Sequence, residues 1–238
     1  MMSRVMFTGS FKKTVYILAP LILYFVTIRI FIYGLQILYT LGVHTGAAHG
    51  LFTGHAAFFK NAVSITSYAL MIMLLILVYG KTDDLKAAFK KTEVKDIPRM
   101  MIVFAAGGVF SVGLNLLAAF ILEHVKLGGD MEVPSSFDPS ETPFAAGLIL
   151  YCLLAPVLEE LVFRWLEYGR IKRCFSGRIA VIVSSLFFAV LHFNPVQMVY
   201  AFIMGCIMAF IMERYDDLKL SMLFHIAANC LIFIPAYF

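Results

Sequence analysis

Two adjacent carboxylates and a guanidinium interrupt an apolar stretch of the sequence at Glu159, Glu160 and Arg164. The residues before them, 144–158, carry no charge, so the three charges fall where a membrane-spanning helix is expected. Glu160 and Arg164 are four residues apart, so in a helix they share a face and can pair. Glu159 is rotated by about 100° from Glu160. It therefore has no partner within its own helix.

Two other apolar segments carry polar side chains that could complete a site. His192 ends one of them, and His225 and Asn229 lie four residues apart in another, where they share one helical face. At about 1.5 Å per residue, Glu159 lies about 16 Å from the basic end of its segment, and Asn229 lies about 14 Å into its own. The three segments thus place polar groups in the middle of the bilayer, where ionisable side chains are costly and usually functional.

These residue types suggest hydrolysis of an amide bond. A carboxylate beside a histidine can take a proton from water, and a second histidine with an amide can donate hydrogen bonds to an oxyanion. The set Glu159, His192 and His225 could instead hold Zn²⁺ with water in the open position. No serine or cysteine is evidently paired with a base, so a nucleophilic triad is unsupported.

Each polar group also has a purely structural interpretation. Glu160 and Arg164 could form only an ion pair that locks helices together, and Asn229 could be an interhelical hydrogen bond. His192, close to Asn194-Pro195, could be an interfacial residue. The hypothesis of a site therefore depends on the three segments meeting at one depth.

The composition places the chain among membrane proteins. Its 238 residues are 61% hydrophobic and 14% charged, whereas a soluble domain carries about a quarter charged residues. The net charge of +4 is small and the basic residues form no stripe, which argues against a nucleic-acid partner. We predict an all-α, polytopic membrane helix bundle whose environment is the lipid bilayer.

Seven apolar segments approach the length of a membrane span. They cover residues 15–40, 61–79, 100–122, 144–168, 178–193, 196–212 and 221–237, of which the fifth is short. Asn194-Pro195 predicts a tight turn between the fifth and the sixth. In the loop 81–99, mixed charges alternate with apolar residues, which favours a helix lying on the membrane surface over a solvated loop.

The loop charges predict the orientation. Basic residues concentrate in the N-terminal tail, in the loop 80–99 and after the fourth segment, whereas the loop 124–143 holds Lys126 alone. The positive-inside rule then places the N-terminus in the cytoplasm and the C-terminus outside. Seven spans satisfy this parity.

Together, Glu159-Glu160-x-x-x-Arg164, Phe188-x-x-x-His192 and His225-x-x-x-Asn229 resemble the motifs of the CPBP intramembrane proteases. This group comprises the type II CAAX prenyl proteases and the bacteriocin-processing proteins, also called Abi proteins. The motifs stand in the family's order over about the last hundred residues. We therefore expect a variable three-span region, 1–143, and a four-span catalytic core, 144–238, in one membrane domain.

The resemblance implies an intramembrane endopeptidase in which Glu159 activates water together with His192. It implies that His225 and Asn229 stabilise the oxyanion or act as ligands, and that Glu160 and Arg164 support the site. The family is labelled metalloprotease, and a metal-free glutamate mechanism is also argued for it. We favour the glutamate mechanism without a cofactor and leave zinc, held by Glu159, His192 and His225, as the alternative.

The expected substrate is a peptide or a membrane protein at a bacterial plasma membrane, and a prenylated substrate is less favoured. A non-catalytic bacteriocin immunity or binding protein is a second hypothesis. A small transporter that uses Glu159, Glu160 and Arg164 as a polar pathway is a third, although no two-fold repeat supports it. The sequence carries no signal for the oligomeric state.

Overall fold

The computed structural model describes residues 9–44, 56–124, 139–140 and 142–238. Every regular element in these ranges is a helix. Within these ranges, six helices are long and apolar enough to cross a membrane, and a seventh, Gly177–Val190, is apolar but shorter. The predicted all-α membrane bundle is confirmed, and the short helix is the fifth predicted segment.

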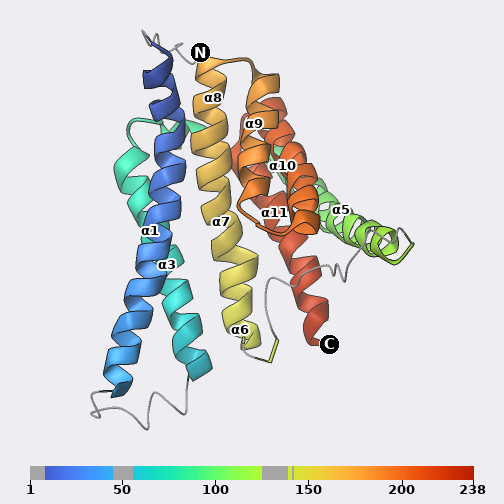
Figure 1. Cartoon of the computed structure of the whole chain (residues 1–238). Helices are drawn as coiled ribbons and strands as arrows, with labels where there is room; N and C mark the ends of the chain where they lie inside the picture. Colours follow the sequence, from blue (N-terminus) through green and yellow to red (C-terminus); the bar gives the residue numbers. More distant parts are fainter. Residues whose placement is uncertain (1–8, 45–55, 125–138, 141) are drawn as a thin grey trace.

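The first three spans are α1 (Ser10–His44), α3 (Ala56–Tyr79) and α5 (Ile97–His124). α1 and α3 lie against each other on one side, and α5 packs against α11 (Leu218–Phe233) on the other (Figure 1). Gly107 allows this close approach, because a Cβ there would meet the Phe224 carbonyl oxygen at 2.2 Å. Ser111 donates a hydrogen bond of 2.9 Å to the Ala228 carbonyl oxygen. Small residues that let helix backbones approach in this way are common between membrane helices.

The segment between α3 and α5 is not the surface helix predicted for 81–99, so that prediction is wrong. It holds only the short α4 (Leu85–Ala88) and a 3₁₀ turn, η1 (Val94–Asp96). Asp83 turns inward and is buried. Its carboxylate accepts hydrogen bonds of 2.6–3.0 Å from Arg170 and Arg173. These contacts hold the chain around Asp83 in a turn, so the segment 81–99 does not form one continuous helix.

The fourth span is one continuous helix, Phe144–Cys174, that contains two π-helical stretches. In chain order its parts are α6 (Phe144–Gly147), π-helical η2 (Leu148–Leu154), α7 (Ala155–Glu160), π-helical η3 (Leu161–Tyr168) and α8 (Gly169–Cys174). π-helical turns are rare and occur frequently at functional sites. Here they flank α7, which carries Glu159 and Glu160.

The last helices are α9 (Gly177–Val190), α10 (Pro195–Tyr215) and α11, which continues into the 3₁₀ turn η4 (Ile234–Tyr237). The turn between α9 and α10 is tight, as predicted, because Asn194 Oδ1 accepts a 3.1 Å hydrogen bond from the Gln197 backbone and Pro195 opens the helix. α9 is about 21 Å long, whereas the hydrocarbon core is about 30 Å thick. The antiparallel α9–α10 pair packs against η3 and ends about halfway along the fourth span (Figure 1).

Because α9 and α10 are antiparallel, the topology of the other spans does not depend on whether this pair crosses the bilayer. α1 begins at one end of the bundle and the chain ends at the other (Figure 1). Which end faces the cytoplasm, and the bacterial origin, remain predictions. Most of the loop 124–143, whose charges contributed to the predicted orientation, lies outside the described residues.

Candidate active site

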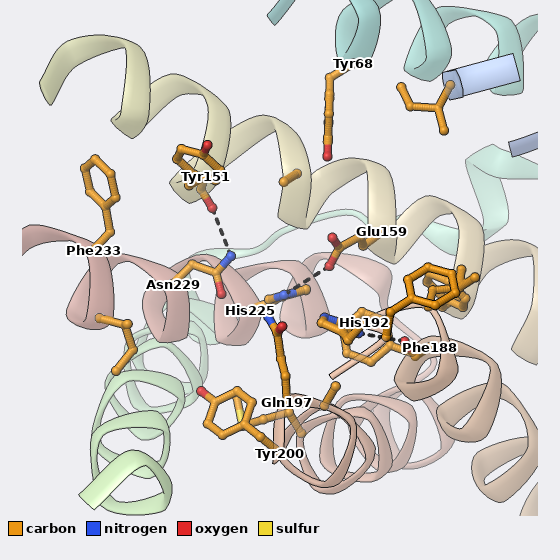
Figure 2. Close-up of a pocket in the computed structure, with 18 of the residues that line it drawn as sticks. Tyr68, Tyr151, Glu159, Phe188, His192, Gln197, Tyr200, His225, Asn229 and Phe233 are labelled. Atoms are coloured by element: carbon orange, nitrogen blue, oxygen red, sulfur yellow. Dashed lines mark hydrogen bonds and ion pairs between the residues drawn. The ribbon is translucent and has the colours of Figure 1, made fainter. Parts of the chain in front are cut away.

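A cavity of about 560 Å³ within the bundle is lined by all four predicted catalytic residues, Glu159, His192, His225 and Asn229. Figure 2 shows them approaching one another from α7, from the turn after α9 and from α11. Residues that lie far apart in the sequence therefore share one space, as a site between helices requires.

Glu160 lies beneath this cavity and is fully buried. Its Oε2 is 3.5 Å from Arg164 Nε, and the Ser221 hydroxyl donates a hydrogen bond to the same oxygen. Its Oε1 is 3.1 Å from His225 Nδ1. The expected pairing of Glu160 with Arg164 is therefore present, and two side chains of α11 hold the same carboxylate.

Glu159 faces the cavity, with 22% of its side chain exposed. Its Oε2 is 3.5 Å from His225 Nε2, which is longer than an ordinary hydrogen bond. His225 thus stands between the two glutamates and turns one ring nitrogen towards each. The Nδ1 contact with Glu160 fixes the imidazole, while the looser contact leaves the Glu159 carboxylate available to a molecule in the cavity.

His192 lies in the turn after α9, and its Nδ1 is 2.9 Å from the Phe188 carbonyl oxygen. Because a carbonyl oxygen only accepts hydrogen bonds, Nδ1 carries the proton here and Nε2 is left as an acceptor. Phe193, the next residue, has a φ of 56°, a strained conformation that clusters at functional sites. Among the described residues, Glu159 forms its ion pair with His225 and none with His192.

Phe188 packs against both histidines and against the guanidinium of Arg164. Its ring centroid is 4.9 Å from that of His192 and 5.8 Å from that of His225, and Arg164 Cζ is 4.6 Å from it. Within the described residues, Arg164 Nε and Nη1 have no hydrogen-bond partner, and Nη2 reaches the Gly205 carbonyl oxygen at 3.5 Å. The buried cation is therefore stabilised by Glu160 and by the aromatic face.

Asn229 is oriented by the backbone of the fourth span. Its Nδ2 donates a 2.9 Å hydrogen bond to the Tyr151 carbonyl oxygen (Figure 2). This oxygen is accessible because the Ala155 N–H bonds to the Leu150 carbonyl in the π-helical stretch, and Pro156, next in line, has no N–H to donate. An amide nitrogen carries two hydrogens, so the second N–H of Asn229 remains for a group in the cavity.

Comparison with known families identifies this constellation. The family model described as type II CAAX prenyl endopeptidase Rce1-like matches residues 141–231, which include all three motifs. The predicted resemblance to the CPBP family is thus matched over these residues. The match supports a CAAX-type intramembrane endopeptidase in general, and thus a protease that is integral to the membrane. No curated protein and no solved structure matches the chain significantly.

Residues outside the three motifs also line the cavity, and the sequence analysis did not predict them. The first three spans contribute Tyr24, Arg29, Tyr68 and Asn115, and α10 contributes Gln197 and Tyr200. Arg29 alone carried a usable signal, since it is a cation inside the apolar segment 15–40. Because the first three spans reach the cavity, the division at residue 143 stays a prediction.

The proposed zinc ligands Glu159, His192 and His225 are not gathered into one metal site. Within the described residues, no group of three His, Cys, Asp or Glu side chains is arranged to hold a metal ion. Glu159 and His225 approach each other, and the contact of His192 Nδ1 with the Phe188 carbonyl oxygen leaves its Nε2 as an acceptor, but the three side chains do not converge on one point. The residues as placed do not fit a three-ligand centre.

Proposed function

We propose that this protein is an endopeptidase that hydrolyses a peptide bond of a peptide or membrane-associated protein by means of water activated by Glu159. The observation that carries the proposal is the meeting of Glu159, His192, His225 and Asn229 around one cavity within the bundle. We further propose that it acts at a bacterial plasma membrane with its N-terminus in the cytoplasm, as the loop charges predict.

In the first step, water in the cavity attacks the carbonyl carbon of the scissile bond. The Glu159 carboxylate accepts the proton that this water loses, and His192 Nε2 accepts the hydrogen bond of its other hydrogen. A new C–O bond forms, and the carbonyl oxygen becomes an oxyanion. The loose contact of Glu159 with His225 supports this role, because the carboxylate is not consumed by a tight ion pair.

The oxyanion needs donors that are already in place before the reaction. Asn229 offers its second N–H, while the first holds the amide against the Tyr151 carbonyl. His225 donates from Nε2 when it is protonated, and Glu160 keeps its ring in position through Nδ1. Fixed donors of this kind stabilise the transition state without reorganisation.

In the second step, the protonated Glu159 gives its proton to the amide nitrogen as the C–N bond breaks. One product carries the new carboxyl group and the other a free amine, so the atoms of one water molecule are divided between them. Glu160, Arg164 and Ser221 contact no reacting atom in this scheme. They are positioning residues that hold His225.

The test compares Glu159→Gln with Glu123→Gln, an exposed glutamate near the end of α5. Purified protein in detergent is incubated with a peptide library, and products are identified by mass spectrometry. We expect Glu159→Gln to lower kcat about 10²- to 10⁴-fold and Asn229→Ala to lower it about 10²- to 10³-fold, while Glu123→Gln keeps wild-type activity. Wild-type turnover by a folded Glu159→Gln protein would refute the proposal.

Chelation distinguishes the zinc-dependent alternative. We expect full activity in the presence of 1,10-phenanthroline and no stoichiometric zinc by elemental analysis, since the described side chains form no three-ligand group. Activity that disappears with the chelator and returns with added Zn²⁺ would replace the glutamate mechanism by the zinc one.

A further inference from the structure

Arg29 is a cation in the apolar helix α1, and its side chain lines the cavity. The residue is exposed, and its guanidinium lies 5.4 Å from the centroid of the Phe25 ring. No described carboxylate forms an ion pair with it. An arginine at membrane depth is costly, so a group that pairs with it during function is expected.

Two contacts place Arg29 at the depth of Glu159. Arg170 donates a hydrogen bond to the Tyr16 carbonyl oxygen at one end of the bundle. From that contact Arg29 lies about 20 Å along α1, and Glu159 lies about 16 Å along the antiparallel fourth span. The rings of Tyr24 and Phe163, 6.3 Å apart, give the same register. Arg29 and the proposed base are therefore level with each other across the cavity.

Arg29 also borders the gap between α1 and the turn that carries His192. The Phe25 ring beside its guanidinium is 6.4 Å from the ring of Phe193. α1 packs against α3, η3 and α8 but has no extensive contact with α9 or α10 within the described residues. On this side the cavity is bordered by two aromatic side chains that are partly exposed, instead of by packed helices.

We propose that Arg29 is a specificity residue that binds the C-terminal carboxylate of a peptide substrate entering between α1 and the α9–α10 turn. The inference rests on the proposed function. A guanidinium matches a carboxylate with two parallel hydrogen bonds, which a point charge does not provide. Because Arg29 and Glu159 line the same cavity, the anion and the scissile bond lie close together. A substrate that ends at Arg29 also needs no further space for its chain beyond this residue.

The experiment uses two peptides of identical sequence that the wild-type protein cleaves, one with a free C-terminal carboxylate and one with a C-terminal amide. We expect kcat/KM to be about 10- to 100-fold higher for the acid, the range of a lost charge-assisted hydrogen bond. In Arg29→Gln the ratio falls to about one, and Arg29→Lys retains part of it. Arg178→Gln, an exposed arginine at the start of α9 outside the cavity, keeps the full ratio.

Equal cleavage of the two peptides by the wild-type protein overturns the inference without any variant. A preference for the acid that survives in Arg29→Gln overturns it as well. If Arg29 instead holds a lipid phosphate, phosphatidylglycerol will raise the melting temperature of the wild type but not of Arg29→Gln, and the two peptides will be cleaved equally. Each of these results leaves the proposed function intact provided that Glu159→Gln is inactive, so the two failures are distinguishable.

Discussion

The fourth span carries two polar clusters that differ in how completely their atoms are paired. At one end, both oxygens of Asp83 accept hydrogen bonds from arginines of α8, and the Asp83 backbone carbonyl accepts a 3.0 Å bond from Trp165 Nε1. In α7, Glu160 is fully bound, but Glu159 has only a 3.5 Å contact; in η3, two nitrogens of Arg164 have no hydrogen-bond partner among the described residues.

The difference separates a structural cluster from a chemical one. Buried polar groups are normally satisfied, and each exception needs an explanation. Both side-chain oxygens of Asp83 are already bonded to arginines, so we assign Asp83 the role of joining α3 to α8. In the other cluster, the Glu159 carboxylate borders a cavity, where a substrate and a water molecule can reach it. Mutations should therefore affect stability in the first cluster and activity in the second.

The largest loss of stability is expected from Asp83→Ala. It leaves Arg170 and Arg173 buried without their carboxylate, which costs about 3–5 kcal/mol. Unfolding of the purified protein in mixed micelles measures this loss, and activity per folded molecule should stay within about two-fold of the wild type. Lys95→Ala is the control, because its ion pair with Glu93 is exposed and contributes about 0–1 kcal/mol. If the two variants lost the same unfolding free energy, Asp83 would not be the structural centre of its cluster.

Glu160→Gln should affect both properties. The neutral amide leaves Arg164 without a counter-charge, which lowers the unfolding free energy by about 3 kcal/mol. It also loosens His225, so we expect kcat to fall about 10- to 100-fold with little change in KM, by analogy with the loss of residues that orient active-site ligands. A stability loss with an unchanged kcat would show that Glu160 belongs with the structural cluster.

Ser221→Ala removes one hydrogen bond to the Glu160 carboxylate and leaves its charge in place. The Ser221 hydroxyl donates to Glu160, and its removal leaves a buried acceptor less satisfied, at a cost of about 1–3 kcal/mol. Ser184→Ala is a matched control, since that buried hydroxyl contacts a carbonyl of its own helix. In Ser221→Ala, both the thermal unfolding temperature and the pH profile of kcat should change. In Ser184→Ala, neither of these two quantities should change.

The smallest effect is expected from mild acid. Burial raises the pKa of Asp83, but the hydrogen bonds and charges of Arg170 and Arg173 outweigh it, so this pKa lies below its ordinary value. Asp83 therefore stabilises the fold fully above about pH 4, the unfolded value, and the contribution is lost as the pH falls through the folded pKa. Titration of Asp83 should therefore not change the unfolding midpoint of the wild type between pH 7 and pH 5. The unfolding free energy of the wild type should approach that of Asp83→Asn only at lower pH.

Much of the fold and part of the candidate site could be predicted from the sequence. Hydrocarbon forces long apolar segments into helices, so the helical class and the approximate positions of the seven apolar helices follow from the apolar segments of the sequence. Polar groups at one depth have few partners other than each other, which is why His192, His225 and Asn229 meet Glu159 around one cavity. The i, i+4 rule correctly gives the pairing of Glu160 with Arg164.

The remaining features depend on tertiary contacts that no local pattern encodes. A helix repeat assigns Glu159 and Glu160 to different faces, yet His225 reaches both because an imidazole has two nitrogens. The predicted helix in 81–99 fails because Asp83 is drawn inward by arginines about ninety residues later. The π-helical stretches and the cavity position of Tyr68 have no motif to mark them.

The short length of α9 has a consequence for the supply of water to the cavity. Each turnover consumes one water molecule, and the hydrocarbon interior holds almost none. The α9–α10 pair ends about halfway along the fourth span (Figure 1). His192 lies in the turn at this end of the pair, just after α9. α9 is shorter than the hydrocarbon core, and a bilayer can adapt to a short helix by thinning locally. We expect such thinning beside α9 to shorten the distance that water must travel from the membrane surface to Glu159.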